Sequence, residues 1–186
     1  MRVGVLALQG DFREHLRALE RLGAEGVEVR EPQDLAGVER LIIPGGESTT
    51  ISLLMRKSGL DRRIRELGRE GLPLFGTCAG LILLARELRG ELDLVKPLGL
   101  IDIAVRRNAY GRQVDSFEEE LKIEGLGRFH GVFIRAPQIE RVGPGVEVLA
   151  YQGERPVLAR EGRVLVSSFH PELTGDERVH RYFLEL

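Results

Sequence analysis

The sequence contains one cysteine, Cys78, in a setting typical of a nucleophile. Residues 76–80 read G-T-C-A-G and lie between an apolar run that predicts a strand and one that predicts a helix. Small neighbours let the chain turn sharply, and the start of a helix favours the thiolate. A lone cysteine is more often a buried structural residue, but this context favours the nucleophile. The N–H group of Ala79 could then help to bind an oxyanion.

A thiolate nucleophile needs a base, and four histidines compete for that role. His15 and His180 fall on predicted amphipathic helices, where we expect them to be solvated. His130 opens a predicted strand and is expected to be structural. His170 follows the apolar run 164–169 at the carboxyl edge of the predicted sheet, where ligands bind in such folds. We therefore predict that His170 is the base.

The residues after His170 can supply an orienting carboxylate. Pro171 biases His170 toward an extended backbone, in which residues two apart point the same way. Glu172 would then hydrogen-bond one imidazole nitrogen and leave the other facing Cys78, in the manner of a Ser–His–Asp triad. The H-P-E sequence alone is a weak motif, and a surface turn is the simplest alternative.

A second glycine-rich turn, P-G-G-E-S at residues 44–48, follows a buried run and precedes a helix that we expect Ser48 to cap. Adjacent glycines let N–H groups approach a ligand closely, although an ordinary strand-to-helix turn explains the residues equally well. The chain has no P-loop or dinucleotide-binding pattern. Its histidines also lack the spacing of metal ligands, so we expect no metal site.

The elements that would position these residues alternate between strand and helix in the first half and are mostly strands in the second. This order predicts an α/β fold with a mostly parallel sheet, helices on both faces and an antiparallel strand extension. No linker or repeat is visible, so we predict one domain over residues 1–186. Predicted strands cover residues 3–8, 27–30, 41–43, 74–77, 99–105, 117–123, 129–134, 146–151, 156–160 and 163–168. Predicted helices cover residues 12–22 (capped by Asp11), 48–57, 61–69, 79–88 and 176–185.

Bulk composition narrows the class of protein. The 186 residues are 42% hydrophobic and carry a net charge of −2, which disfavours binding to nucleic acid or an anionic membrane. No apolar run approaches the roughly 18 residues of a membrane span, and the first residues do not resemble a signal peptide. With one cysteine there can be no internal disulfide, so we expect a soluble cytoplasmic protein. The basic residues between positions 56 and 65 predict a solvated helix face, with a docking patch as the alternative.

Together these motifs resemble one known family, the class I (triad-type) glutamine amidotransferases. Within it the chain is most similar to the glutaminase subunits of pyridoxal 5′-phosphate synthase. The G-T-C-A-G turn and H-P-E are shared across the family, whereas P-G-G-E-S-T at residues 44–49 and R-Q-V-D-S-F at residues 112–117 are specific to this subgroup. Other matching segments are L-Q-G-D-F at residues 8–12 with His15, R-N at residues 107–108, and G-V-F-I-R-A-P at residues 131–137.

The resemblance implies a flavodoxin-like fold and a triad of Cys78, His170 and Glu172 that hydrolyses L-glutamine to glutamate and ammonia. The ammonia would enter a separate synthase subunit, in a hetero-oligomer that builds pyridoxal 5′-phosphate from a pentose phosphate and a triose phosphate. No cofactor is implied, and Gly46 and Ala79 would hold the oxyanion. The glutamine contacts implied by the family are Gly46, Glu47, Ser48, Arg107, Ile134 and Arg135, with Arg106 as the alternative to Arg107.

Three other interpretations remain open: a glutaminase of another biosynthetic pathway, a non-enzymatic binding module on the same fold, and a cysteine hydrolase acting on γ-glutamyl peptides. The P-G-G-E-S-T loop argues against the first. An intact set of Cys78, His170 and Glu172 argues against the second. The short chain, with no appended domain, fits a dedicated subunit better than the third.

Overall fold

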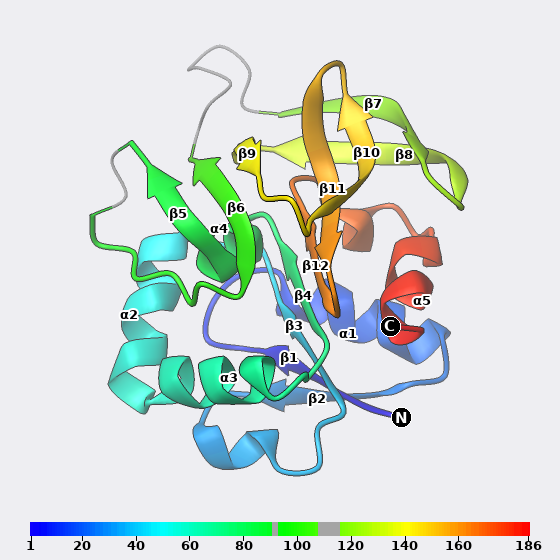
Figure 1. Cartoon of the computed structure of the whole chain (residues 1–186). Coiled ribbons are helices and arrows are strands. Elements are labelled where there is room, and N and C mark those ends of the chain that lie inside the picture. Colours follow the sequence, from blue (N-terminus) through cyan, green and yellow to red (C-terminus); the bar gives the residue numbers. More distant parts are fainter. Residues whose placement is uncertain (91–92, 108–115) are drawn as a thin grey trace.

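The computed structural model describes residues 1–90, 93–107 and 116–186 (Figure 1). Its central sheet has the strand order β10-β11-β12-β4-β3-β1-β2. The five strands from β12 to β2 are parallel, and the hairpin β10–β11 extends the sheet in antiparallel fashion. The parallel part has the strand order of flavodoxin-like folds, so the predicted fold class is confirmed. The seven strands are β1 (Arg2–Leu6), β2 (Glu25–Val29), β3 (Arg40–Ile43), β4 (Leu74–Thr77), β10 (Glu147–Gln152), β11 (Arg155–Glu161) and β12 (Val164–Ser167).

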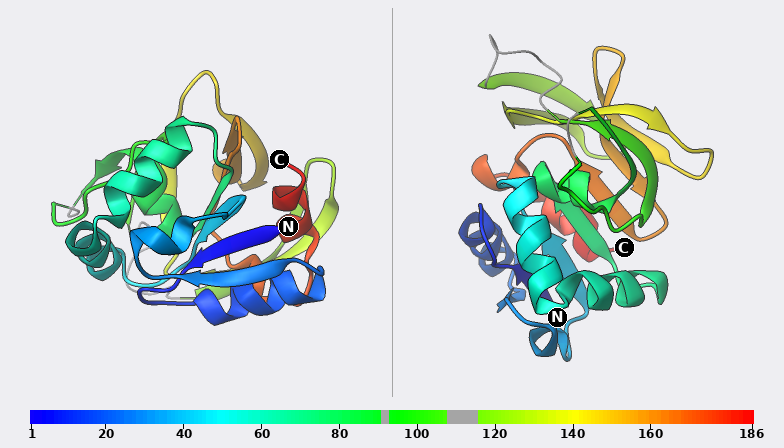
Figure 2. Two further views of the ribbon diagram at one scale, coloured as in Figure 1. Left: turned by 90° about the horizontal axis from the view of Figure 1, so that it is seen from below. Right: turned by 90° about the vertical axis from the view of Figure 1, so that its left-hand side faces the viewer.

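Helices cover both faces of this sheet, as predicted (Figure 2). Helices α1 (Phe12–Arg21) and α5 (Arg178–Leu184) lie on one face, and α2 (Ser48–Ser58), α3 (Leu60–Arg69) and α4 (Ala79–Leu84) lie on the other. The strands serve both layers because their side chains alternate: in β3, Ile42 joins the cluster under α1 and α5, whereas Leu41 and Ile43 join the other. Within the described residues, no helix has the length and apolar character needed to cross a bilayer.

Two smaller sheets complete the described part of the chain. The strands β5 (Ala85–Arg89), β6 (Ile101–Arg106) and β9 (Gln138–Val142) form one, and the hairpin β7 (Ser116–Ile123) and β8 (Gly127–Ile134) forms the other. The hairpin adds Leu121, Phe129 and Phe133 to the core under α1 and α5. Each small sheet therefore closes the core over a different face of the central sheet. Two short 3-10 helices, η1 (Pro32–Leu35) and η2 (Pro171–Leu173), lie in connections.

The sequence predictions are wrong for two strands of the three-stranded sheet, β5 and β9. The helix predicted over residues 79–88 ends at Leu84, because residues 85–89 leave the helical path and pair with β6 as strand β5. The helical spacing of apolar residues continues past this point, so only the pairing with a distant strand reveals the change. Strand β9 was also missed, since it is short and only Ile139 in it is fully buried.

The predicted helix caps are wrong in detail. Glu47, not Ser48, is the N-cap of α2, and its carboxylate accepts hydrogen bonds from the N–H groups of Thr49 and Thr50 at 3.2 and 2.7 Å. A carboxylate reaches these donors and also suits the positive end of the helix. Asp11 occupies the N-cap position of α1 but makes no side-chain capping hydrogen bond.

Candidate active site

Cys78 lies in a tight turn between β4 and α4, at the carboxyl end of the central sheet. Its φ angle is +54°, which is rare and strained for a residue with a side chain. A Cβ atom on Gly76 would lie 2.5 Å from the oxygen of Gly80, and one on Gly80 would lie 2.0 Å from the oxygen of Ile43. The backbone at Gly76 therefore packs directly against that at Gly80, and the backbone at Gly80 packs against the end of β3. Such close backbone contacts are possible because glycine has no side chain. The sharp turn predicted from the sequence is present, and the residue it carries is 7% exposed.

Gly80→Ala is expected to destabilise the protein by about 3 kcal/mol or more, because the new methyl group would overlap the main chain of β3. The matched control is Gly125→Ala, where no atom lies within 4 Å of the added carbon. That control should cost about 1 kcal/mol, the price of a left-handed backbone without glycine. Denaturant unfolding measures both, and equal losses would mean that the turn tolerates a side chain.

His170 follows β12, and Cys78 follows β4. Because β12 and β4 are adjacent parallel strands, the two residues lie close together at the same edge of the sheet. Its Nδ1 atom lies 2.5 Å from Oε1 of Glu172. Burial alone would lower the pKa of His170, but hydrogen bonds to Cys78 and Glu172, with the negative charge of both, outweigh it and raise the pKa to about 11. The imidazole is therefore protonated at neutral pH and able to give a proton to a leaving amine.

Glu172 reaches this imidazole by a route that the sequence did not predict. The expected extended chain is wrong, because Pro171 opens the 3-10 helix η2 and Glu172 follows within it. Proline suits the first turn of a helix as well as an extended segment, since its φ angle is compatible with both. The turn buries Glu172 to 3% exposure. The two side chains meet as predicted, although the backbone between them is not extended.

A cavity of about 460 Å³ opens in front of Cys78, a volume in the range of small-molecule sites. Glu172 does not line it, whereas the other predicted site residues do. Asp11, Ile82 and Pro137 line it as well, and the sequence had not singled them out for this site. The predicted residues around the cavity are Gly46, Glu47, Ser48, Cys78, Ala79, Arg107, Ile134, Arg135 and His170.

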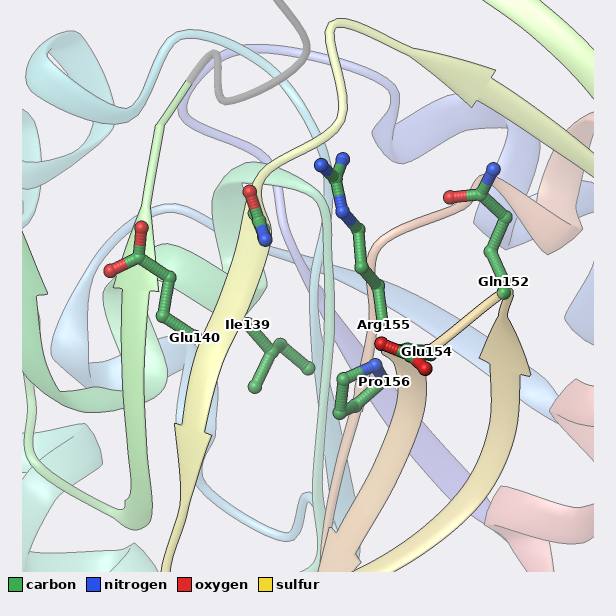
Figure 3. Close-up of a pocket in the computed structure, with 8 residues that line it drawn as sticks. Ile139, Glu140, Gln152, Glu154, Arg155 and Pro156 are labelled. Carbon is green, nitrogen blue, oxygen red and sulfur yellow. The ribbon is translucent and has the colours of Figure 1, made fainter.

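A larger cavity of about 840 Å³ lies between β9 and the hairpin β10–β11 (Figure 3). Its lining contains glutamine, glutamate and arginine side chains but neither a thiol nor an imidazole. One of these side chains, Glu140, is already paired with Arg106 on β6. Size therefore does not identify the reactive site, and the smaller cavity holds the residues able to perform covalent chemistry.

The structure separates the two arginines that the sequence left as alternatives. Arg107 lines the cavity, and its Nη1 atom donates to the hydroxyls of Ser48 and Thr49 at 3.2 Å each. Arg106 instead donates to Glu140 at 2.6 Å. Arg106 is the last residue of β6 and Arg107 lies in the turn after it, where the chain directs the two side chains to different partners. Of the R-N match at residues 107–108, Asn108 lies outside the described residues, as do residues 112–115 of the R-Q-V-D-S-F segment.

The glycine turn after β3 is held by the segment that follows β1. Oε1 of Gln9 accepts the N–H of Glu47 at 2.7 Å, and the N–H of Asp11 donates to the carbonyl of Gly45 at 2.9 Å. A Cβ atom on Gly45 would lie 2.7 Å from Cε1 of His170, so this backbone packs directly against the imidazole. The sequence signal for Gln9 and Asp11 was their place after a predicted parallel strand, since such strands end at one edge.

The prediction that His15 and His180 are solvated is wrong. Both side chains are fully buried, because α1 and α5 turn these positions toward the sheet. Nδ1 of His15 lies 2.9 Å from Nε2 of His180, and Nε2 of His15 lies 3.7 Å from Oε2 of Glu172. His130 is the exposed histidine, and it contacts Glu118 at 2.7 Å. The candidate site therefore continues inward from Glu172 to two residues that the sequence had set aside.

Comparison with known proteins identifies the family. A family model described as the SNO glutamine amidotransferase family matches residues 5–186. A Thermus thermophilus protein named pyridoxal 5′-phosphate synthase subunit PdxT is 64% identical over 185 residues, covering 99% of this chain and 96% of its own. A protein of that name from Dehalococcoides mccartyi is 56% identical over 189 residues, with coverages of 100% and 97%.

Solved structures agree with this result. A crystal structure described as a glutamine amidotransferase superposes with a TM-score of 0.95 at 61% identity, covering 98% of this chain and 97% of its own. PurLQS from Thermotoga maritima superposes with a TM-score of 0.76 at 18% identity, with coverages of 99% and 97%, and shares the fold. The family match spans nearly the whole chain, including every candidate residue described above. The chain belongs to the SNO glutamine amidotransferase family.

Proposed function

We propose that this chain is the glutaminase subunit of a pyridoxal 5′-phosphate synthase and acts as one domain over residues 1–186. The observation that carries the proposal is Cys78 beside a protonated His170, at a cavity of small-molecule size, in a member of a glutamine amidotransferase family. The relatives named PdxT are subunits of pyridoxal 5′-phosphate synthase. The ammonia released here therefore serves the synthase subunit of that complex, in vitamin B6 biosynthesis.

In the proposed reaction, the Cys78 thiolate attacks the side-chain carbonyl carbon of L-glutamine. N–H groups at Gly46 and Ala79 bind the oxyanion, and the N–H of Ala79 is suited to this because the first turn of a helix leaves such groups without an intrahelical acceptor. His170 gives its proton to the departing amine, and ammonia leaves a γ-glutamyl thioester. His170 then takes a proton from the water that attacks the thioester, which releases glutamate and restores the thiolate. Glu172 orients the imidazole and stabilises its positive charge throughout.

We assign the α-carboxylate of glutamine to the guanidinium of Arg107, because such a pair forms two parallel charge-assisted hydrogen bonds. Ser48 and Glu47 lie beside this arginine and the cavity. Gly46, Ile134 and Arg135 complete the proposed contacts. We include Arg135 among these contacts because it lines the cavity and has a φ angle of +44°. Residues with strained backbone angles cluster at ligand sites.

The reaction proposed for the chain itself is hydrolysis of an amide, so the chain would act as a hydrolase. No metal or organic cofactor takes part in the proposed steps. We place the reaction in the cytoplasm, where a single catalytic thiol stays reduced. Co-purification from the native cell, with the partner identified by mass, tests the proposed complex. Recovery of a synthase from another pathway would overturn the vitamin B6 assignment.

The isolated chain is expected to be a poor glutaminase that becomes active when the synthase subunit binds. The carbonyl of Gly45 and the N–H of Glu47 are both engaged inside the chain, by Asp11 and Gln9. Partner contact would select a loop conformation that turns an N–H group toward the oxyanion. One such donor is worth roughly a hundredfold or more in rate. Glutamate release is measured for the pure chain and then with saturating synthase subunit, and equal turnover would refute activation.

A further inference from the structure

Behind Glu172 lies a pair of buried histidines for which the proposed reaction has no role. His15 comes from α1 and His180 from α5, and both rings have 0% exposure. The ring of Phe75 meets both imidazoles edge-on, at interplanar angles of 80° and 78°. Two polar rings inside a core are costly unless they are hydrogen-bonded, so their partners show what the pair does.

Both imidazoles are neutral. Burial is the main cause that holds the pKa of His15 well below 6.5, and electrostatic interactions with His180 and His170 lower that pKa further. Burial lowers the pKa of His180 to about 4. A neutral imidazole has one N–H donor and one bare nitrogen, so each ring exists in one of two tautomers. The contacts of the pair decide between them.

One tautomer fits every contact. His180 Nδ1 is buried and has no hydrogen-bond partner among the described residues. A buried N–H group without an acceptor is rarer in proteins than a buried acceptor without a donor, so we assign the proton of His180 to Nε2, which donates it to Nδ1 of His15 at 2.9 Å. The proton of His15 must then lie on its own Nε2. The opposite tautomer would also turn a lone pair toward the carboxylate of Glu172.

The Nε2–H group of His15 faces the reaction centre. It lies 3.2 Å from Oγ1 of Thr77, the residue before the nucleophile, and 3.7 Å from Oε2 of Glu172. That carboxylate oxygen is buried and accepts no hydrogen bond within the described part of the chain, while Oε1 is used by His170. A contact of 3.7 Å is longer than a hydrogen bond, but such contacts often tighten when substrate binds.

We propose that His15 is a positioning residue of the glutaminase reaction: its Nε2–H supports the second oxygen of Glu172, and His180 holds His15 in the tautomer that makes this possible. The inference rests on the proposed function above. The proposal adds His15 and His180 behind the proposed triad of Cys78, His170 and Glu172. It gives α1 and α5, which carry these two histidines, a role in holding the catalytic carboxylate in place. Without this donor, Glu172 would keep its place in the chain but lose the group that holds its carboxylate toward His170.

Two isosteric substitutions separate positioning from packing. In His15→Gln the amide nitrogen takes the place of Nε2 and can still donate toward Glu172. In His15→Asn the shorter side chain reaches only the place of Nδ1, so the contact with His180 survives and the donor is lost. With saturating synthase subunit present, kcat of the Asn variant should fall roughly ten- to a hundredfold, as for the loss of one charge-assisted hydrogen bond, with little change in KM. The Gln variant should recover most of kcat.

The matched control is His130→Asn, since His130 is exposed on β8 and lies outside the proposed machinery. It should leave kcat unchanged. Thermal unfolding of every variant separates loss of fold from loss of turnover. Equal falls in kcat for the Gln and Asn variants, or full turnover of a folded Asn variant, would overturn the inference while the wild type remains active. An inactive wild type in the same assay would overturn the proposed function and the inference with it.

A measurement on the unmodified chain tests the same point without any variant. Imidazole ¹⁵N chemical shifts distinguish a protonated nitrogen from a bare one. The expected result is a proton on Nε2 and none on Nδ1 for both His15 and His180. A proton on Nδ1 of His15 would overturn the inference even if the Asn variant failed to fold.

Discussion

Replacing Cys78 with alanine is expected to abolish glutamine hydrolysis and to leave the fold intact. In the proposed reaction the Cys78 thiolate forms the covalent intermediate, and the sequence has no second cysteine to take its place. Losing the nucleophile of a triad removes most of the catalytic advantage, so turnover should fall by at least roughly ten-thousandfold. The substitution removes one sulfur atom and keeps a Cβ at the strained turn, so the free energy of unfolding should change little.

The measurement is glutamate release with saturating synthase subunit, together with thermal unfolding of both proteins. A second readout uses a glutamine-like diazo-ketone, which should label the wild type at its single cysteine and fail to label the alanine variant. Added glutamine should slow the labelling. Ammonia release by a folded alanine variant would remove Cys78 from the mechanism, and labelling that glutamine cannot slow would place the thiol outside the substrate site.

Glu172→Gln is expected to lower kcat by roughly a thousand- to ten-thousandfold, with a much smaller effect on KM. Oε1 of Glu172 lies 2.5 Å from Nδ1 of His170, and in the proposed reaction it orients the imidazole and stabilises its charge, a role concentrated in the transition state. Its charge is also one of the causes that raise the pKa of His170 to about 11. Removing that charge lowers the pKa, so the protonated imidazole is lost at lower pH. The alkaline limit of kcat should therefore move to lower pH.

The pH profile of kcat for both proteins, measured with the synthase subunit, checks this result. Glu118→Gln is the matched control, because Glu118 also contacts a histidine, His130 at 2.7 Å, but on the exposed hairpin β7–β8. That variant should behave as the wild type. An effect of Glu172→Gln on KM alone would assign Glu172 to substrate binding instead.

Most of the fold, and the central residues of the candidate site, could be predicted from short-range patterns in the sequence. The apolar runs and glycine turns predicted five parallel strands in nearly the observed places. A buried parallel strand is recognisable locally, because it is a short apolar run bounded by turn residues. The turn around Cys78 could be predicted for the same reason. The glycines that it requires, Gly76 and Gly80, lie only two residues from Cys78 in the sequence. His170 and Glu172 were also found locally, and the position of Arg107 followed from the family resemblance.

Contacts between distant segments decided the rest. Strand β5 exists because β6 and β9 complete its sheet, and no pattern within residues 79–88 marks the change at Ala85. Arg107 was separated from Arg106 by the partners that each one meets, Ser48 in one case and Glu140 in the other.

The histidines show the limit most clearly. Sequence alone determined that His170 could serve as a base, because it follows a buried strand and precedes a proline and a carboxylate. It could not determine that His15 and His180 are buried together, since 165 residues separate them and each sits in a helix whose pattern also suits a solvated position. Only the packing of α1 and α5 on the same face of the sheet brings the two rings behind Glu172. Burial then fixes their charge, because an imidazole removed from water stays neutral unless an anion compensates it.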